Sequence, residues 1–154
     1  MAEKKKLVWF CNKILSRRIN LDSFDDKLII QKAIYLSQKL GMSFDYRFGW
    51  YVRGVYSSSL TTELYDSYLG AASNKTDYTP TNKDKEIVKQ LQAIKNALDT
   101  PTASLELISS IVYASKDNKD EKNIVTFINR TKPWFSEADT LKAIKLVKKL
   151  PLQN

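Results

Sequence analysis

Residues able to carry acid–base or nucleophilic chemistry are scarce in this sequence. Histidine is absent, and Cys11 is the single cysteine. These counts exclude Ser-His-Asp and Cys-His nucleophiles and a zinc site of the usual composition. The sequence also contains no GxxxxGK[ST] loop and no GxGxxG turn that could hold a nucleotide phosphate. We therefore expect a non-catalytic protein with no metal site and no cofactor.

Pairs of carboxylates are the remaining candidates for catalysis. They are Asp25 with Asp26, Glu63 with Asp66, and Asp120 with Glu121. Each pair lies beside a predicted helix start or on a polar helix face, where the helix dipole and capping already account for acidic residues. An enzyme that uses carboxylate chemistry is thus the weakest of the functional hypotheses.

A first candidate binding surface lies on the polar side of a predicted N-terminal helix. Trp9 is found there among basic residues, and an aromatic ring beside lysines can stack on a base or clamp a phosphate. The surface would comprise Lys5, Lys6, Trp9, Lys13 and Arg17. The alternative is that another element, such as the C-terminal helix, covers this side and places Trp9 in the core.

A second candidate is the outer face of a predicted β segment, which carries Arg47, Tyr51 and Arg53. Two guanidinium groups beside a phenol could contact a nucleic-acid groove, a phosphate backbone or an acidic partner strand. The alternative is a solvated strand face with ordinary cross-strand pairs.

A third candidate is a basic stripe on the last predicted helix, formed by Lys142, Lys145 and Lys149. At 100° per residue these side chains lie within about 60° of one another. The stripe could contact phosphates, or it could be a solvated face that complements the negative end of the helix dipole.

Hydrophobic periodicity predicts the elements that position these residues. A wide apolar stripe indicates a buried central helix at about 25–40. Residues 44–53 alternate apolar and polar types and predict one short β segment or hairpin, in which Gly49 is a bulge, a bend or the turn, and which Gly54 ends. About six helices should surround the central one, at 3–18, 59–70, 101–114, 121–130 and 136–150, with one more after Thr81 that carries Ile87, Leu91, Ile94 and Leu98 at helical spacing. The predicted fold class is therefore mainly α (α+β).

Capping residues mark several of the predicted helix starts. Ser23, Thr81 and Ser136 are each followed by an aspartate three residues later, and Thr100 precedes a proline at the first helical position. Residues 71–82 form a polar connection with turn-forming residues at Asn74 and Pro80.

Length and charge limit the remaining possibilities. A chain of 154 residues fits a single domain, 1–154, and 43% hydrophobic residues suffice for an ordered core. The apolar run of residues 7–11 is too short for a signal peptide or a membrane span, so we expect a cytoplasmic protein without a membrane partner. The net charge of +8 favours an anionic partner, either nucleic acid or an acidic protein surface. A homodimer is also left open.

One stretch of the sequence resembles a known family. In the central helix the matching residues are Lys27, Leu28, Gln31, Lys32, Ile34, Tyr35 and Gln38, and in the β segment and the turn after it they are Trp50, Tyr51, Gly54, Tyr56, Ser57 and Leu60. This pattern resembles the Panacea-type (SocA-like) antitoxin domain and its uncharacterised YwgA-like relatives. Val55 stands where that family often has proline, which implies a less rigid turn. The resemblance covers residues 27–41 and 44–65.

The resemblance implies a mainly helical module with little β structure and no catalytic motif. Members of the family neutralise a toxin by direct contact or act as protein-interaction adaptors. Our leading hypothesis is an antitoxin-like or regulatory protein that acts by stoichiometric binding to a protein partner, for instance a toxin. The alternative is a small basic nucleic-acid-binding protein that uses Trp9 and Tyr51 as stacking platforms.

Overall fold

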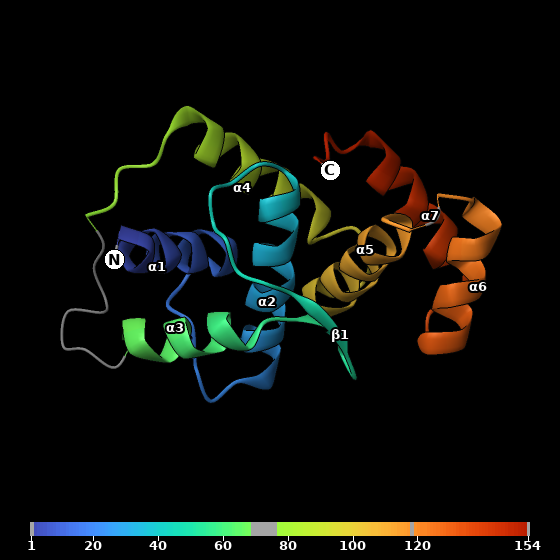
Figure 1. The fold of residues 1–154 in the computed structure, drawn as a ribbon, viewed down its shortest axis with the longest axis horizontal. Helices are drawn as coiled ribbons and strands as arrows, with labels where there is room; N and C mark the ends of the chain where they lie inside the picture. The colour runs from blue at the N-terminus through green and yellow to red at the C-terminus, as the bar shows by residue number, and fades with distance from the viewer. Residues whose placement is uncertain (1, 69–76, 118, 154) are drawn as a thin grey trace.

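The computed structural model describes residues 2–68, 77–117 and 119–153. It is mainly helical, as predicted, with one small antiparallel hairpin (Figure 1). The elements are α1 (Ala2–Leu15), α2 (Phe24–Lys39), β1 (Gly49–Tyr51), β2 (Gly54–Tyr56), α3 (Ser58–Tyr68), α4 (Asn82–Ile94), α5 (Pro101–Ser115), α6 (Glu121–Thr131) and α7 (Glu137–Lys149). Within these residues the mainly helical fold class with one short hairpin is therefore confirmed.

Two helices form the centre of the molecule. In α2 every residue from 28 to 37 is buried, and in α5 every residue from 104 to 112 is buried. A helix that is enclosed around its whole circumference must lie inside the fold, so the central position predicted for α2 is correct. The sequence analysis did not single out α5 as its equally buried partner.

The remaining helices pack around this pair. On one side α1 contacts α2, α3 and α4, and on the other side α6 and α7 pack against α5 and against each other (Figure 1). One hydrophobic cluster includes side chains from all seven of these helices. Within the described residues, no helix combines the length and the apolar character that crossing a bilayer requires.

The β structure differs from the prediction in extent and in the position of its turn. The strands pair Trp50 with Val55, and the chain reverses at Val52 and Arg53 rather than at Gly49. Gly54 does not end the β segment but begins its second strand, with a φ of +97° that favours glycine.

Residues 44–48 alternate in burial, as the period-two pattern predicted, but they are not part of a sheet. The Gln38 side chain takes the place of a partner strand. Its amide nitrogen donates to the Tyr46 carbonyl at 3.0 Å, and its oxygen accepts from the Tyr46 N–H at 2.9 Å. A single side chain thus satisfies an extended backbone, which sequence periodicity cannot distinguish from a strand.

The predicted caps are confirmed. The side chains of Ser23, Thr81, Thr100 and Ser136 all accept a backbone N–H of their helix, and Thr81 forms a complete capping box with Asp84. The N-terminal helix ends at Leu15 instead of residue 18 because Ser16 adopts a φ of 60°. Asn74 and most of the predicted polar connection lie outside the described residues.

Candidate functional site

The surface predicted on α1 is wrong at its two central residues. Trp9 is only 6% exposed and packs against Tyr78, with ring centroids 5.5 Å apart. Lys6 is also buried, and its ammonium donates to Ser43 at 2.7 Å and lies 3.8 Å from Asp84. The alternative reading of Trp9 as a core residue is therefore confirmed, although Tyr78 covers its ring rather than the C-terminal helix.

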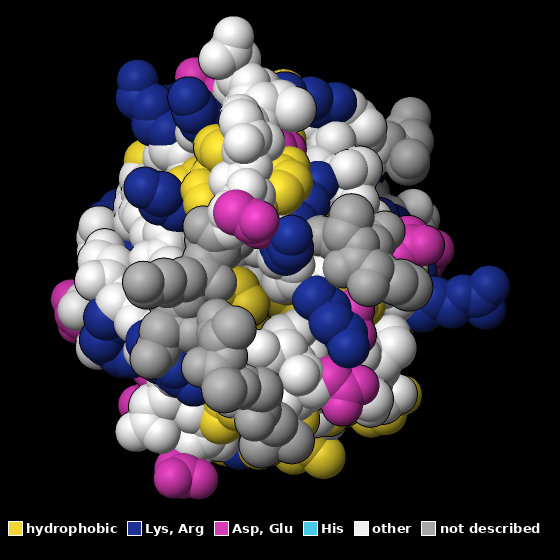
Figure 2. Space-filling view, turned by 90° about the vertical axis from the view of Figure 1, so that its left-hand side faces the viewer, with side chains coloured by type: hydrophobic (Ala, Val, Ile, Leu, Met, Phe, Trp, Pro, Cys, Tyr) yellow, Lys and Arg dark blue, Asp and Glu magenta, His cyan; other side chains and the backbone are white. Residues whose placement is uncertain are grey.

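The other basic residues of this predicted surface, on α1 and just after it, are largely engaged in intramolecular contacts. Arg17 binds the Asp26 carboxylate through two nitrogens, at 2.6 and 2.7 Å. Lys5 forms an exposed ion pair with Asp77 at 3.0 Å. Lys13 is exposed. On the face that carries the N-terminal end of α1, basic side chains are spread out with acidic ones among them (Figure 2).

The lysines of the last helix form no common site with those of α1. The Lys142 ammonium donates to the Ala97 carbonyl at 2.9 Å and so ties α7 to the segment before α5. Lys145 and Lys149 are exposed on α7.

The predicted β-segment residues divide into two groups. Tyr51 and Arg53 line a pocket, whereas Arg47 lies outside it in the extended segment before the hairpin. Trp50 stacks on Tyr113 of α5 at 5.1 Å between ring centroids. Because neighbouring residues of a strand point to opposite sides, this contact directs Tyr51 away from the core and toward the pocket.

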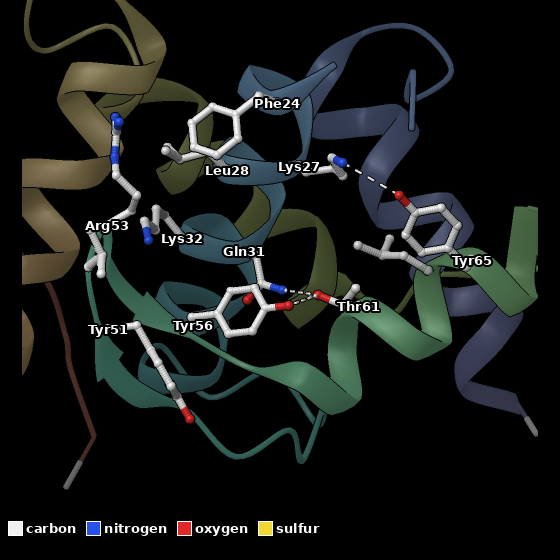
Figure 3. Close-up of a pocket in the computed structure, with 12 residues that line it drawn as sticks. Phe24, Lys27, Leu28, Gln31, Lys32, Tyr51, Arg53, Tyr56, Thr61 and Tyr65 are labelled. Carbon is white, nitrogen blue, oxygen red and sulfur yellow. Dashed lines mark hydrogen bonds between the residues drawn. The ribbon is translucent and has the colours of Figure 1, made fainter. Parts of the chain in front are cut away.

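The pocket has a volume of about 400 Å³ and lies between α2, the hairpin and α3 (Figure 3). Its walls combine aromatic and aliphatic side chains with a few polar groups, a composition typical of ligand and peptide sites. The lining residues are Phe24, Lys27, Leu28, Gln31, Lys32, Tyr51, Val52, Arg53, Tyr56, Thr61, Leu64 and Tyr65.

Exposed hydrophobic side chains surround the mouth of the pocket. Among the described residues, five large hydrophobic side chains are exposed, and all except Trp134 line this pocket. The four are Phe24 at 56%, Tyr51 at 57%, Val52 at 91% and Tyr65 at 37%. Scattered exposed hydrophobic residues are normal on a protein surface, but their concentration around one hollow indicates a binding site.

Hydrogen bonds fix the wall where α2 meets α3. The Gln31 amide donates to the Ser57 carbonyl at 3.0 Å and to the Thr61 hydroxyl at 2.9 Å, and its oxygen accepts the Ser57 N–H at 2.9 Å. The Tyr56 hydroxyl lies 2.7 Å from the same Thr61 hydroxyl (Figure 3). These hydrogen bonds hold this wall in place without a bound partner.

Buried charged side chains lie on the side of the pocket where α2 meets the hairpin. Lys32 is 2% exposed and its ammonium donates to the Val55 carbonyl at 2.6 Å. Burial lowers the pKa of Lys32 to about 8. Glu106 of α5, also buried, binds the Lys132 ammonium at 2.8 Å and lies 3.4 Å from the Arg53 guanidinium.

The lining of the pocket is positively charged. Lys27, Lys32 and Arg53 contribute to it, and no aspartate or glutamate is among the lining residues that the structure describes. The Arg53 guanidinium also lies over the Phe24 ring, 5.2 Å from its centroid, and so joins the hairpin to the start of α2 across the mouth.

Sequence reasoning identified Tyr51 and Arg53 but missed the contributions of α2 and α3. Phe24 and Tyr65 carried a detectable signal, because each is a large hydrophobic residue next to a polar helix face. Lys32 gave no such signal, since only the packing of α2 against the hairpin places its ammonium beside the pocket.

Cys11 is remote from this pocket and is fully buried. Burial raises the pKa of its thiol to about 12, so the thiol is protonated at neutral pH and is not a nucleophile. The described residues also bring together no group of three or more His, Cys, Asp and Glu side chains that could hold a metal ion.

No protein-family model matches the chain, and neither the curated proteins nor the solved structures contain a match. The pocket is therefore the feature of the molecule that bears on its function.

Proposed function

We propose that this chain is a non-catalytic protein-interaction module that acts by stoichiometric binding, like the Panacea-type antitoxins it resembles. A partner protein docks on the face around the pocket. The observation that carries the proposal is the gathering of Phe24, Tyr51, Val52 and Tyr65 around one mouth. Aromatic side chains are enriched at protein interfaces because they bury a large area at a small cost in conformational entropy.

The protonated thiol of Cys11 supports a non-catalytic role. It is the single cysteine of a chain without histidine, so the common nucleophile and general-base pairings are missing. In the pocket, Gln31, Tyr56 and Thr61 are occupied with one another and with backbone groups. These polar groups maintain the shape of a binding surface.

The alternative of nucleic-acid binding is weakened by the contacts of α1. A stacking platform needs an exposed ring, and Trp9 is buried. A phosphate track needs adjacent exposed cations, but Lys6 is buried and Arg17 is bound to Asp26.

Affinity purification from the native host with three forms of the chain tests the proposal. Val52→Glu places a charge at the mouth, at a side chain that is 91% exposed and therefore buries little surface on folding. Ala93→Glu introduces the same charge at an exposed position of α4, which contributes nothing to the pocket. We expect the wild type and Ala93→Glu to retain a stoichiometric partner and Val52→Glu to lose it.

Two results would overturn the proposal. One is the absence of any stoichiometric protein partner, and the other is equal retention of the partner by Val52→Glu. Fluorescence anisotropy with mixed-sequence duplex DNA and single-stranded RNA completes the test. Micromolar binding that weakens steeply with salt would favour the nucleic-acid alternative.

A further inference from the structure

We propose that the pocket binds an acidic side chain of the partner, presented next to an aromatic or aliphatic residue, with Arg53 and Lys32 as its charge partners. This inference rests on the proposed function and adds the chemistry of the docked segment. The charge of the lining, the donors near it and the apolar walls all favour such a segment.

Charge complementarity is the first argument. Lys27, Lys32 and Arg53 line the pocket, and no acidic residue does so among the described part of the chain. A buried carboxylate, that of Glu106, lies 3.4 Å from the Arg53 guanidinium and is bound by Lys132 at 2.8 Å. A single carboxylate thus faces three cations, Lys132, Lys32 and Arg53, and the wall keeps an excess of positive charge that an anionic group can neutralise.

The donors of these cations are the second argument. A guanidinium carries five N–H donors and an ammonium three. Arg53 makes one 3.4 Å contact with Glu106 and is half exposed, and Lys32 directs one hydrogen bond at the Val55 carbonyl. Donors therefore remain on both groups for a carboxylate placed between the hairpin and α2, where Figure 3 shows Lys32 and Arg53 side by side.

The apolar walls are the third argument. Phe24, Leu28, Val52 and Leu64 line the same hollow, and its volume of about 400 Å³ exceeds what one carboxylate group fills. A segment that inserts an acidic side chain together with an apolar neighbour would use both kinds of wall. Exclusion of water by the apolar side chains also strengthens the charge-assisted hydrogen bonds.

Matched peptides test this inference without knowledge of the partner. The probes are the capped tetrapeptides Ac-Ala-Phe-Glu-Ala-NH2 and Ac-Ala-Phe-Gln-Ala-NH2, which have the same shape and differ by one charge. We expect amide chemical shifts of the pocket residues to change in NMR titrations, with about tenfold tighter binding of the glutamate peptide at low salt. The bound glutamate should also raise the pKa of Lys32 from about 8, whereas the glutamine peptide should not.

Arg53→Gln removes one charge partner at a half-exposed position, so the fold is retained. It should abolish most of the preference for the glutamate peptide, and Lys145→Gln, which removes the same charge from exposed α7, should preserve it. Lys32→Met serves as a second variant and should remove the titration near pH 8.

Equal affinity for the two tetrapeptides, or shifts confined to residues outside the pocket, would overturn the inference. A third peptide, Ac-Ala-Phe-Gln-Ala with a free C-terminal carboxylate, would also overturn the inference if it bound more tightly than the capped glutamate peptide. The pocket would then select the end of a chain and not an acidic side chain. If partner capture depends on Val52 but the two tetrapeptides bind equally well, this inference is wrong and the proposed function stands. If no partner protein is captured, the proposed function is wrong, whatever the affinities of the two peptides.

Discussion

The polar side of α1 and the pocket between α2 and the hairpin have similar compositions, but the first is largely covered and the second is open. Each brings a large aromatic residue together with two or more basic side chains. On α1 the ring of Trp9 is buried against Tyr78 and Lys6 pairs with Asp84, and just after α1 Arg17 binds Asp26. Around the hairpin, Tyr51 stays more than half exposed and Arg53 borders an open pocket.

The neighbouring elements thus determine whether such residues are buried in the core or exposed at a binding surface. The residues around Tyr78 and the start of α4 cover α1, and they supply a ring and a carboxylate for its polar side. The described residues provide no comparable cover for the pocket, where Phe24 and Val52 remain exposed. An aromatic residue beside lysines is thus ambiguous until the packing is known.

The strongest way to sharpen this comparison is to truncate one aromatic residue from each region. Trp9→Ala should lower the free energy of unfolding by about 3–5 kcal/mol, because it empties a buried site. Tyr51→Ala, at an exposed site, should change it by no more than about 0.5 kcal/mol. Urea unfolding followed by circular dichroism measures both. Similar losses for the two variants would contradict the distinction.

A second comparison concerns the buried charge behind the pocket. Lys132→Met removes the cation closest to Glu106 and leaves the more distant Arg53 and Lys32, and we expect it to cost about 3 kcal/mol. In the double variant with Glu106→Gln the buried charge disappears with its partner, so most of the stability should return. A double-mutant cycle from chemical denaturation checks this, and purely additive losses would rule out a coupled pair.

The ion pair that anchors the end of α1 should produce a smaller effect that depends on pH. Hydrogen bonds from Arg17 lower the pKa of Asp26 below its ordinary value of 3.8. The stabilisation is therefore present above pH 3.8 and is lost as the pH falls through the lower pKa of the folded state. Asp26→Asn should cost about 1–2 kcal/mol at pH 7.

This cost should shrink toward zero below pH 3.8, which thermal unfolding over a pH series would reveal. Asp66→Asn, at an exposed position of α3, serves as the matched control and should follow the wild type. A difference between Asp26→Asn and the wild type that persists unchanged at pH 2 would contradict the assignment of the ion pair.

The smallest expected effect comes from the exposed lysines of α1. The double replacement of Lys5 and Lys13 by glutamine should alter stability by no more than about 0.5 kcal/mol. If this face contacted nucleic-acid phosphates, the slope of log K against log salt would fall by about 0.9 per lost contact. We expect no such change relative to a Lys145→Gln, Lys149→Gln control in anisotropy titrations. A reduced slope would restore the α1 face as a phosphate-binding site.

Much of the fold was predictable because its signals are local. The capping residues Ser23, Thr81, Thr100 and Ser136 locate their helix starts through hydrogen bonds that span only three residues. The wide apolar stripe of α2 identified the buried centre, since no other environment suits it. The hairpin was only partly predictable, because the amide of Gln38 and a two-residue turn satisfy the extended chain where a longer strand was expected.

A mainly helical chain with a buried α2, a short β hairpin and few groups suited to catalysis could all be predicted from the residues alone. Those properties follow from periodicity, capping and residue counts, which need no knowledge of distant contacts. The burial of Trp9, the place of Lys32 in the pocket lining and the common mouth of Phe24, Tyr51 and Tyr65 depend on the packing of the elements. Exposure and proximity are properties of elements packed together, and residues far apart in the chain set them.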